Sequence, residues 1–432
     1  MRLTKTGLIA TLALLLFVGG CASQKQPQTL SFDNPVTKKL DAGNWDKFNK
    51  AQMDKLMAKH GKGSPNYNPA KPPYVVFDWD NTCIIFDIAE AAYIYQLEHL
   101  IFGMTPAQMD KAIRMGLSNQ NFSKDFNNAA GQPVNIDTLA PDIVSSYTWL
   151  YKNYKGLKGK KSLEVVKKSP QYMDFITKMR YLYEAIGDTF DHAVSYPWIT
   201  YLSTGLTEWD VRDITAKTVE WQNTQTPGKV SWTSPASLPG KAGVVTISWN
   251  NGLRLVPEMQ DLVHKLRDNG ITVWVCSASF VDIIKEISSV AKFGYNNPDT
   301  MVLAMELERD DKGRLMTEFR KGYDQTQGPG KTKTINRFLV SKYGYGPIMI
   351  AGDSEGDQNM MVDFDTVECV LIINRLRKPS TIIGGLSIKA VETYGKADAK
   401  YLLQGRDENK GTFVPSQLAY PLGKTEGQAL RK

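Results

Sequence analysis

The chain has 432 residues, of which 42% are hydrophobic and 22% are charged, as in ordinary globular proteins. This composition excludes an intrinsically disordered chain and a protein with many membrane spans. The formal charge is +7, from 52 lysines and arginines against 45 aspartates and glutamates, and this balance gives little support to nucleic-acid binding.

The first 21 residues have the pattern of a secretory signal peptide. Arg2 and Lys5 precede an apolar run that is too short to cross a bilayer comfortably and ends in "VGGC" at Cys21. The last four residues resemble a bacterial lipobox, which implies an exported protein held to a membrane through lipidated Cys21. With Ala22 next, it would face the periplasm from the outer membrane of a Gram-negative cell. The alternative is a cleaved signal peptide with a chance cysteine, and residues 22–42 are predicted to be a polar tether.

Residues 43–87 are predicted to contain a helix, from about Asn44 to His60, and a first core strand. The strand ends in "YVVFDWDNT", so that Asp78 and Asp80 follow a run of apolar residues. A buried strand cannot easily bury two carboxylates without a partner. Side chains at i and i+2 project to the same side of a strand and can share one ligand. The pattern therefore predicts a divalent cation at this strand end.

Residues 88–249 are predicted to form a large helical insert after this first strand. Five segments show the apolar spacing of amphipathic helices: 88–103, 105–117, 138–154, 171–187 and 207–223. Thr105 before Pro106, and Thr207 with Asp210, are signals for helix starts. The insert also carries a dense basic stretch, Lys152 to Lys168, which we interpret as a solvated surface. The alternatives are contact with anionic lipid headgroups or attraction of a phosphorylated substrate.

Aromatic residues are frequent in the insert, and we expect most of them to pack in its core. The alternative is an aromatic cage for a quaternary ammonium group. The residues concerned are Tyr93, Tyr95, Trp149, Tyr151, Tyr181, Tyr183, Trp198 and Trp209.

Residues 250–432 are predicted to hold the rest of the core. Apolar strands "ITVWVCS", "TMVLAMEL", "PIMIAGD" and "VECVLIINR" alternate with helices over 257–270, 279–294 and 331–344. Such alternation predicts an α/β fold of the Rossmann-like kind, with a mainly parallel sheet and helices on both faces. The first strand belongs to the same sheet, so the helical insert interrupts the core.

Polar residues end several of these strands and are expected to meet in one crevice. Ligands of open parallel sheets bind at the carboxyl ends of the strands. Asp78 and Asp80 end the first strand, Ser277 and Asp353 end two later ones, and Lys331 follows "GPG" at a helix start. Carboxylates suit Mg²⁺, whereas a hydroxyl and an amine suit phosphoryl oxygens.

The four motifs resemble those of the haloacid dehalogenase superfamily of phosphohydrolases. They are "DWDNT", "VCSASF", "GKTKTI" and "GDSEGD", in the order that the family has them, and the resemblance covers about residues 72–90 and 250–410. It implies that the insert is a cap that closes over the substrate. Because position 80 is acidic, the resemblance favours phosphate ester hydrolysis.

The resemblance also implies a role for each motif residue. Asp78 would be the nucleophile that forms an aspartyl phosphate, and Asp80 would be the general acid and base. Thr82 would orient Asp80, while Ser277 and Lys331 would bind the substrate phosphate. Mg²⁺ would be held by Asp78, the backbone carbonyl of Asp80, Asp353 and Asp357, the last as a direct ligand or one shell further out.

Within the superfamily, "FDWDNTC", "VWVCSASF" and "LLQGRDENKGTF" resemble an exported bacterial subgroup related to phosphoserine phosphatase and phosphorylcholine phosphatase. The resemblance favours a phosphorylated amino alcohol such as phosphocholine as substrate. The alternatives are a broad acid phosphatase or nucleotidase that scavenges phosphate, and a binding lipoprotein without catalysis. Arg406 and Asp407 in the last motif are expected to lie in a surface turn, with an approach to the site as the alternative.

The remaining cysteines and the histidines are expected to have structural roles. Cys83, Cys276 and Cys369 are predicted to be buried free thiols, with a disulfide between the first two as the alternative. The four histidines fall at no metal-ligand spacing and are expected on helix surfaces or in packing: His60, His99, His192 and His264.

Overall fold

The structure is a computed structural model that describes residues 36–430. The predicted signal peptide of residues 1–21, the predicted lipidation of Cys21 and most of the predicted tether of residues 22–42 lie outside these residues. Within residues 36–430, no helix combines the length and the apolar character that a membrane crossing needs.

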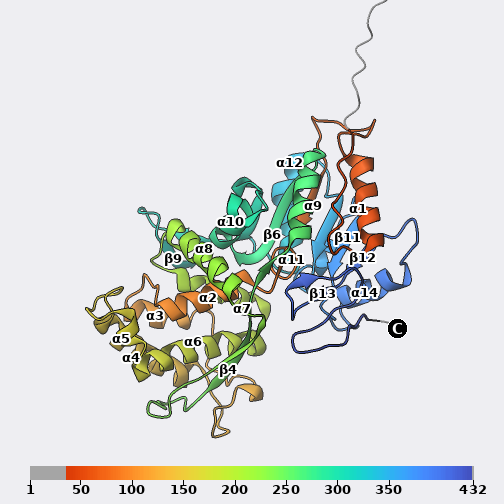
Figure 1. The fold of residues 1–432 in the computed structure, drawn as a ribbon. Coiled ribbons are helices and arrows are strands. Elements are labelled where there is room, and N and C mark those ends of the chain that lie inside the picture. The colour runs from red at the N-terminus through yellow and green to blue at the C-terminus, as the bar shows by residue number, and fades with distance from the viewer. Residues whose placement is uncertain (1–35, 431–432) are drawn as a thin grey trace, which may run out of the picture. The chain divides into compact units, whose positions relative to one another are not determined.

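A parallel sheet forms the centre of the described part of the chain (Figure 1). Its strand order is β12-β11-β10-β1-β6-β7, and each neighbouring pair runs parallel. The strands are β1 Tyr74–Phe77, β6 Thr272–Phe280, β7 Val302–Met305, β10 Met349–Gly352, β11 Cys369–Ile373 and β12 Tyr401–Gln404. This confirms the predicted α/β fold. Because β1 lies between β10 and β6, Asp78 has Asp353, directly after β10, on one side and Ser277 on the other. The prediction that Ser277 ends its strand is wrong, because β6 continues to Phe280.

Both faces of the sheet are covered by helices, as alternation of side chains along each strand requires. On one face Val75 and Phe77 pack in a cluster with α1 Lys47–His60, α9 Pro257–Asp268 and α10 Val281–Ser289. On the other face Tyr74 and Val76 pack with α11 Pro329–Ile335, α13 Gln358–Val362 and α14 Ile382–Glu392. The predicted helix over 331–344 continues from α11 through a π-helical turn, Asn336–Val340, into α12 Ser341–Tyr343.

The insert after β1 has a hydrophobic cluster of its own, drawn from residues between Tyr93 and Trp249. Thr105 and Thr207 form the capping boxes that their sequence predicted. The helices are α2 Ile88–His99, α3 Pro106–Ile113, α4 Ile136–Asn153, α5 Leu163–Val166, α6 Pro170–Thr189, α7 His192–Trp198 and α8 Glu208–Thr224, with 3₁₀ turns Lys124–Phe126 and Ile199–Ser203.

The prediction of a wholly helical insert is wrong at its end. Strands β3 Gly228–Thr233 and β4 Thr246–Asn251 form an antiparallel hairpin there. Exposed and shielded residues alternate along both strands, which is the period of a sheet and not of a helix. Trp232 and Trp249 join the strands through rings whose centroids lie 4.3 Å apart.

Short strand pairs complete the described fold. β2 Ile84–Ile85 pairs with β5 Arg254–Leu255 and so joins the two ends of the insert. β8 Leu307–Arg309 pairs with β9 Leu315–Phe319 around a turn at residues 310–314, and β13 Arg406–Asp407 pairs with β14 Thr412–Phe413. Two further 3₁₀ turns are Ala291–Phe293 and Asp299–Met301. Cys83, Cys276 and Cys369 are buried free thiols, as predicted.

Candidate active site

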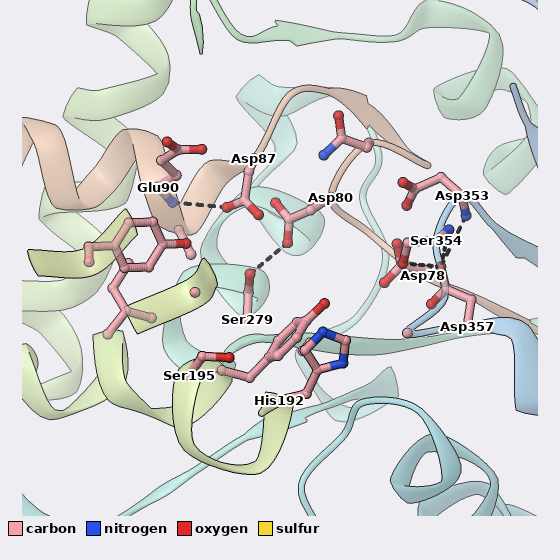
Figure 2. Close-up of a pocket in the computed structure, with 18 of the residues that line it drawn as sticks. Asp78, Asp80, Asp87, Glu90, His192, Ser195, Ser279, Asp353, Ser354 and Asp357 are labelled. Carbon is pink, nitrogen blue, oxygen red and sulfur yellow. Dashed lines mark hydrogen bonds between the residues drawn. The ribbon is translucent and has the colours of Figure 1, made fainter. Parts of the chain in front are cut away.

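Asp78 lies at the floor of a cavity of about 560 Å³ between the strand ends and the insert. It follows β1 directly, and its backbone nitrogen still donates to Ala351 of β10, so the strand pairing fixes its position. Figure 2 shows Asp78 beside Asp353 and Asp357 on one side of this cavity. Burial, followed by the charge of Asp357, raises the pKa of Asp78 well above its usual range, although Lys331 opposes the shift.

Lys331 joins two of these carboxylates. Its Nζ lies 2.6 Å from Asp78 Oδ1 and 2.6 Å from Asp357 Oδ1, and its side chain is buried. Burial alone would lower the pKa of Lys331, but Asp357 and Asp78 outweigh it and raise the pKa. The lysine is therefore protonated and lies beside Asp78, and its role in binding the substrate phosphate stays a prediction.

Asp357 is held mainly by the turn that precedes α13. Its Oδ2 accepts from the backbone nitrogens of Asp353 and Ser354, each at 3.0 Å, and from Ser354 Oγ at 3.1 Å. These bonds leave Oδ1 for Lys331. The fourth motif therefore works as one unit, in which Asp357 shapes the turn that presents Asp353.

Thr82 does not orient Asp80, contrary to the expectation from the sequence. Its Oγ1 lies 2.9 Å from Asp78 Oδ2 and 3.2 Å from Asp353 Oδ1. The turn after β1 folds the threonine back over the strand end, which points the hydroxyl at the nucleophile and not at the following acid. Thr82 thus links the first and fourth motifs.

Asp80 is held instead by Ser279 and by the start of α2. Ser279 Oγ donates to Asp80 Oδ2 at 2.6 Å, and the backbone nitrogen of Ile88 donates to Asp80 Oδ1 at 2.6 Å. Figure 2 shows Asp80 turned toward Ser279 and near Asp87, apart from Asp78, Asp353 and Asp357. Burial and the nearby Asp87 raise the pKa of Asp80, while Ser279 opposes the shift. A carboxyl group with a raised pKa is suited to donate a proton.

The sequence analysis did not identify Ser279, although it lies in the same motif as Ser277. Ser277 is fully buried, is not among the residues that line the cavity, and its Oγ accepts from the nitrogen of Ser279 at 3.1 Å. The structure therefore gives Ser277 a local contact within β6, and its role in phosphate binding stays a prediction. The i and i+2 spacing of the two serines is the signal that could have identified Ser279.

Two arginines were also missed. Arg375 NH1 lies 2.7 Å and Arg377 NH2 3.2 Å from Asp353 Oδ2, and both arginines line the cavity. Burial would raise the pKa of Asp353, but Arg375 and Arg377 overcome it and lower the pKa. Both follow β11 at its carboxyl end, so the rule that identified Asp353 would have found them too.

A divalent cation fits the carboxylate cluster. Asp78, Asp353 and Asp357 each offer an oxygen such that the three oxygens lie within 4.8 Å of one another. All three residues are buried, and oxygen donors of this kind suit Mg²⁺. The side chain of Asp80 lies outside this group, which agrees with its expected contribution through the backbone carbonyl alone.

The insert supplies an acidic wall to the cavity, opposite the motif residues. We use the name acidic wall for Asp87, Glu90, Glu184 and Asp188, all of which line the cavity. The buried guanidinium of Arg180 neutralises part of it, because NH2 pairs with Glu90 and NH1 lies 2.8 Å from Glu184. Four carboxyl groups face this one cation, although burial raises the pKa of Glu90 to about 7, so that Glu90 carries only part of a negative charge at neutral pH.

Most of the aromatic residues named from the sequence pack in the insert, as expected. Of the named set only Tyr183 lines the cavity, and Phe126 and Tyr196 join it. His192 lies on the exposed surface of α7, as expected for the histidines, and that surface faces the cavity. None of the lysines of the basic stretch lines the cavity, so the stretch does not contact a ligand bound there.

The expectation that Arg406 lies in a surface turn is wrong. The side chain is fully buried, and its NH1 and NH2 each lie 3.1 Å from Asn81 Oδ1. Asp407 is buried as well. The tail folds back against the loop after β1, a long-range contact that a local turn signal could not indicate.

Known proteins were compared with this chain by family and by structure. No family model matches it, and no curated protein matches it. A functionally unknown, conserved protein from Anaerococcus prevotii is 34% identical, with a TM-score of 0.83 over 90% of this chain and 99% of that one.

Two other solved structures are much less similar. A phosphoserine phosphohydrolase-like protein from Francisella tularensis is 10% identical over 73% of this chain and 92% of its own, with a TM-score of 0.32. A haloacid dehalogenase family hydrolase from Salmonella enterica is 10% identical over 72% and 65%, with a TM-score of 0.33. TM-scores this low do not establish that the structures share a fold.

The similarity to the Anaerococcus prevotii protein extends over nearly the full length of both chains. The four sequence motifs meet at the carboxyl ends of a parallel sheet, as their resemblance to the haloacid dehalogenase superfamily implied. This chain therefore belongs to one family with the Anaerococcus prevotii protein.

Proposed function

We propose that this protein is a phosphohydrolase that cleaves a small phosphomonoester through a phosphorylated Asp78. The observation that carries the proposal is the geometry at the cavity floor. Asp78 has the buried ammonium of Lys331 at 2.6 Å, while Asp80 is held apart by Ser279 with a raised pKa. A nucleophile, a phosphate-binding cation and a separate proton donor are the groups that this reaction needs.

The first half-reaction transfers the phosphoryl group to the protein. A carboxylate oxygen of Asp78 attacks phosphorus, and the bond from phosphorus to the ester oxygen breaks. The protonated carboxyl group of Asp80 gives its proton to the departing oxygen, so the product leaves as an alcohol. Lys331 balances negative charge on the phosphoryl oxygens during the transfer.

The second half-reaction returns the protein to its first state. The carboxylate of Asp80 takes a proton from a water molecule, whose oxygen attacks phosphorus. The bond from phosphorus to Asp78 breaks, inorganic phosphate leaves, and Asp80 is protonated again. Thr82 holds Asp78 and Asp353 in place in both steps through its hydroxyl group.

Mg²⁺ is the cofactor that we propose, held by Asp78, Asp353 and Asp357 and by the backbone carbonyl of Asp80. Bound there, it would neutralise charge on the carboxylates and on the phosphoryl oxygens. Arg375 and Arg377 fix the orientation of the Asp353 side chain through ion pairs with its Oδ2.

We further propose that the substrate carries a positive charge, as phosphocholine and other phosphorylated amino alcohols do. The motif side of the cavity presents Lys331, Arg375 and Arg377, while the insert presents the acidic wall with Tyr183 and Phe126. An ester with a phosphate at one end and an ammonium group at the other is complementary to both sides. A membrane anchor at Cys21 and export to the periplasm remain part of this proposal on the strength of the N-terminal sequence.

Phosphate release from a panel of phosphomonoesters tests the reaction. The protein lacking residues 1–21 is assayed with Mg²⁺, with a chelator, and as Asp78→Asn. We expect activity that needs the metal and falls at least ~10³-fold in the variant. Activity that survives both changes would contradict the proposal, and silence with every ester would favour a binding lipoprotein.

A matched pair of substrates tests the charge. Phosphocholine is compared with its neutral analogue, in which a carbon atom replaces the quaternary nitrogen. We expect kcat/KM to favour phosphocholine by about 10-fold or more, and Glu184→Gln to reduce the preference. Equal rates on both esters, and on many others, would instead indicate a scavenging phosphatase.

A further inference from the structure

Asn81, the residue between Asp80 and Thr82, has an unusual backbone conformation. Its φ is +60°, in the left-handed region that residues other than glycine seldom adopt. Its nitrogen donates to the carbonyl of Phe86, whose φ is also positive at +70°. Asparagine adopts this region more readily than most residues, whereas a positive φ is an outlier for phenylalanine, so the strain in this loop lies chiefly at Phe86. Such strain persists only where the surroundings hold the loop.

Arg406 supplies the contacts that hold this loop. Its NH1 donates to the backbone carbonyl of Asn81 at 3.2 Å, and both NH1 and NH2 donate to Asn81 Oδ1 at 3.1 Å. The arginine is fully buried and lies 325 positions after Asn81 in the sequence. It pairs with Glu408, which compensates part of the cost of burial.

The last part of the chain fixes Arg406 in turn. The backbone carbonyl of Arg406 accepts a hydrogen bond from the backbone nitrogen of Tyr420 at 2.8 Å, and the backbone nitrogen of Glu408 donates to the carbonyl of Tyr420 at 2.9 Å. The side-chain Oε2 of Glu408 accepts from the backbone nitrogen of Leu422 at 3.0 Å. We call residues 405–428 the C-terminal brace. Burial lowers the pKa of Arg406 to about 10, with Arg375 contributing, so the guanidinium keeps its charge at neutral pH.

The same brace reaches the strand end that carries the arginines of the site. Asn374 Nδ2 donates to the carbonyl of Gln417 at 2.7 Å and to that of Gln428 at 3.1 Å. Asn374 directly precedes Arg375, which contacts Asp353. The brace thus touches the loop after β1 and the end of β11, on the two sides of the carboxylate cluster.

We propose that the C-terminal brace positions the catalytic loop, with Arg406 as the positioning residue that sets the backbone of Asn81 and so the direction of Asp78 and Asp80. Arg406 does not line the cavity and is not proposed to touch substrate. The kinetic part of this inference rests on the proposed phosphohydrolase function, whereas the structural part does not. The two parts are therefore tested separately.

Amide hydrogen exchange tests the structural part. Arg406→Lys keeps the charge but loses the fork that spans the carbonyl and side chain of Asn81. In the folded variant we expect the peptide covering residues 78–86 to exchange roughly 10-fold faster, because the local opening costs less. Arg212→Lys is the matched control, since Arg212 is also buried and paired but its partners Glu208, Glu286 and Asp299 lie outside residues 78–86. Unchanged exchange of residues 78–86 in Arg406→Lys would overturn the proposal.

Steady-state kinetics tests the consequence for catalysis. We expect Arg406→Lys to lower kcat about 100-fold with KM changed less than about threefold, because misplacement of the loop affects the reacting atoms more than substrate binding. Arg212→Lys should leave kcat unchanged. A loss of thermal stability with full kcat would show a merely structural role and contradict the proposal. If the wild-type protein releases no phosphate from any ester, the exchange experiment still decides the structural part.

Discussion

At the scale of single residues, the hydroxyl group of Ser279 helps to fix the orientation of the Asp80 side chain. Ser279 Oγ and the nitrogen of Ile88 each donate to one carboxylate oxygen at 2.6 Å, so both oxygens are held. Hydrogen bonds to charged groups contribute about 1.5–3 kcal/mol. Loss of the serine should therefore free Asp80 to rotate away from the position in which it serves the leaving group.

Ser279→Ala is expected to lower kcat roughly 10- to 100-fold through the loss of this bond. Ser279→Thr, which keeps a hydroxyl group, should retain most of the activity. Steady-state phosphate release measures both variants. Equal activity of Ser279→Ala and wild type would show that Asp80 does not depend on this contact.

Glu90 predicts how stability depends on pH. Burial, only partly opposed by Arg180, raises the pKa of Glu90 to about 7 from 4.5. The folded protein thus keeps a proton that the unfolded chain releases near pH 4.5, so the free energy of unfolding falls as pH rises from about 4.5 to about 7. We expect a contribution of about 2 kcal/mol, reduced by partial exposure of the side chain.

Chemical denaturation at pH 5 and pH 8 measures this contribution, with Glu90→Gln as the comparison. The variant has no carboxyl group to titrate, so its stability should change less between the two pH values. A pH dependence identical to that of the wild type would mean that Glu90 ionises normally.

Much of the site at this scale could be predicted from the sequence. Asp78, Asp80 and Asp353 were found because polar residues after apolar strands are anomalous, and Lys331 because it follows "GPG" at a helix start. The partner of Thr82 could not be predicted, because it depends on how the turn after β1 folds back. The contact of Arg406 with Asn81 joins positions 325 apart, and no local pattern indicates it.

At the scale of elements, the insert is held together by a buried charge cluster. Lys178 of α6 has its Nζ 3.0 Å from Asp142 of α4 and 2.7 Å from Asp174, with all three side chains buried. Asp142 also accepts from the nitrogens of Lys241 and Ala242. The cluster therefore ties two helices to the loop between β3 and β4.

Lys178→Met should destabilise the protein by about 3–5 kcal/mol, because it leaves two carboxylates buried without a cation. Lys217→Met is the matched control, since Lys217 pairs with Asp213 on an exposed surface and should change stability by less than about 1 kcal/mol. Urea unfolding compares the two. Equal small effects would mean that the buried cluster is not needed for stability.

The elements that sequence reasoning missed share a physical cause. β3 and β4 alternate polar and apolar residues on a partly exposed hairpin, so neither presents the continuous apolar run that identified the core strands. β12 has only four residues and lies next to a turn-rich tail. Helix α6, with 20 residues and a polar and an apolar face, was predictable because its period repeats over several turns.

At the scale of the whole molecule, the cavity joins charges of opposite sign from two parts of the fold. The strand ends contribute a carboxylate cluster together with Lys331 and two arginines, and the insert contributes the acidic wall. In the described part of the chain, ionisable groups from segments far apart in sequence are thus brought to one place. A cation bound at the carboxylate cluster should therefore stabilise the folded protein.

Mg²⁺ is expected to raise the midpoint of thermal unfolding, because a cation that binds only the folded state stabilises it by mass action. At a free concentration 100 times its Kd the gain is about 2.7 kcal/mol. Asp353→Asn should show little shift with Mg²⁺. An unchanged midpoint of the wild-type protein at millimolar Mg²⁺ would contradict the proposed metal site.

The most direct test of the proposed mechanism is to trap the phosphorylated protein. A preferred phosphomonoester is mixed with the protein and Mg²⁺, the reaction is quenched in acid within one turnover, and the peptides are analysed by mass spectrometry. The account predicts one phosphoryl group on the peptide that contains Asp78, and none in Asp78→Asn. Rapid phosphate release without any label on that peptide, together with an active Asp78→Asn variant, would contradict it.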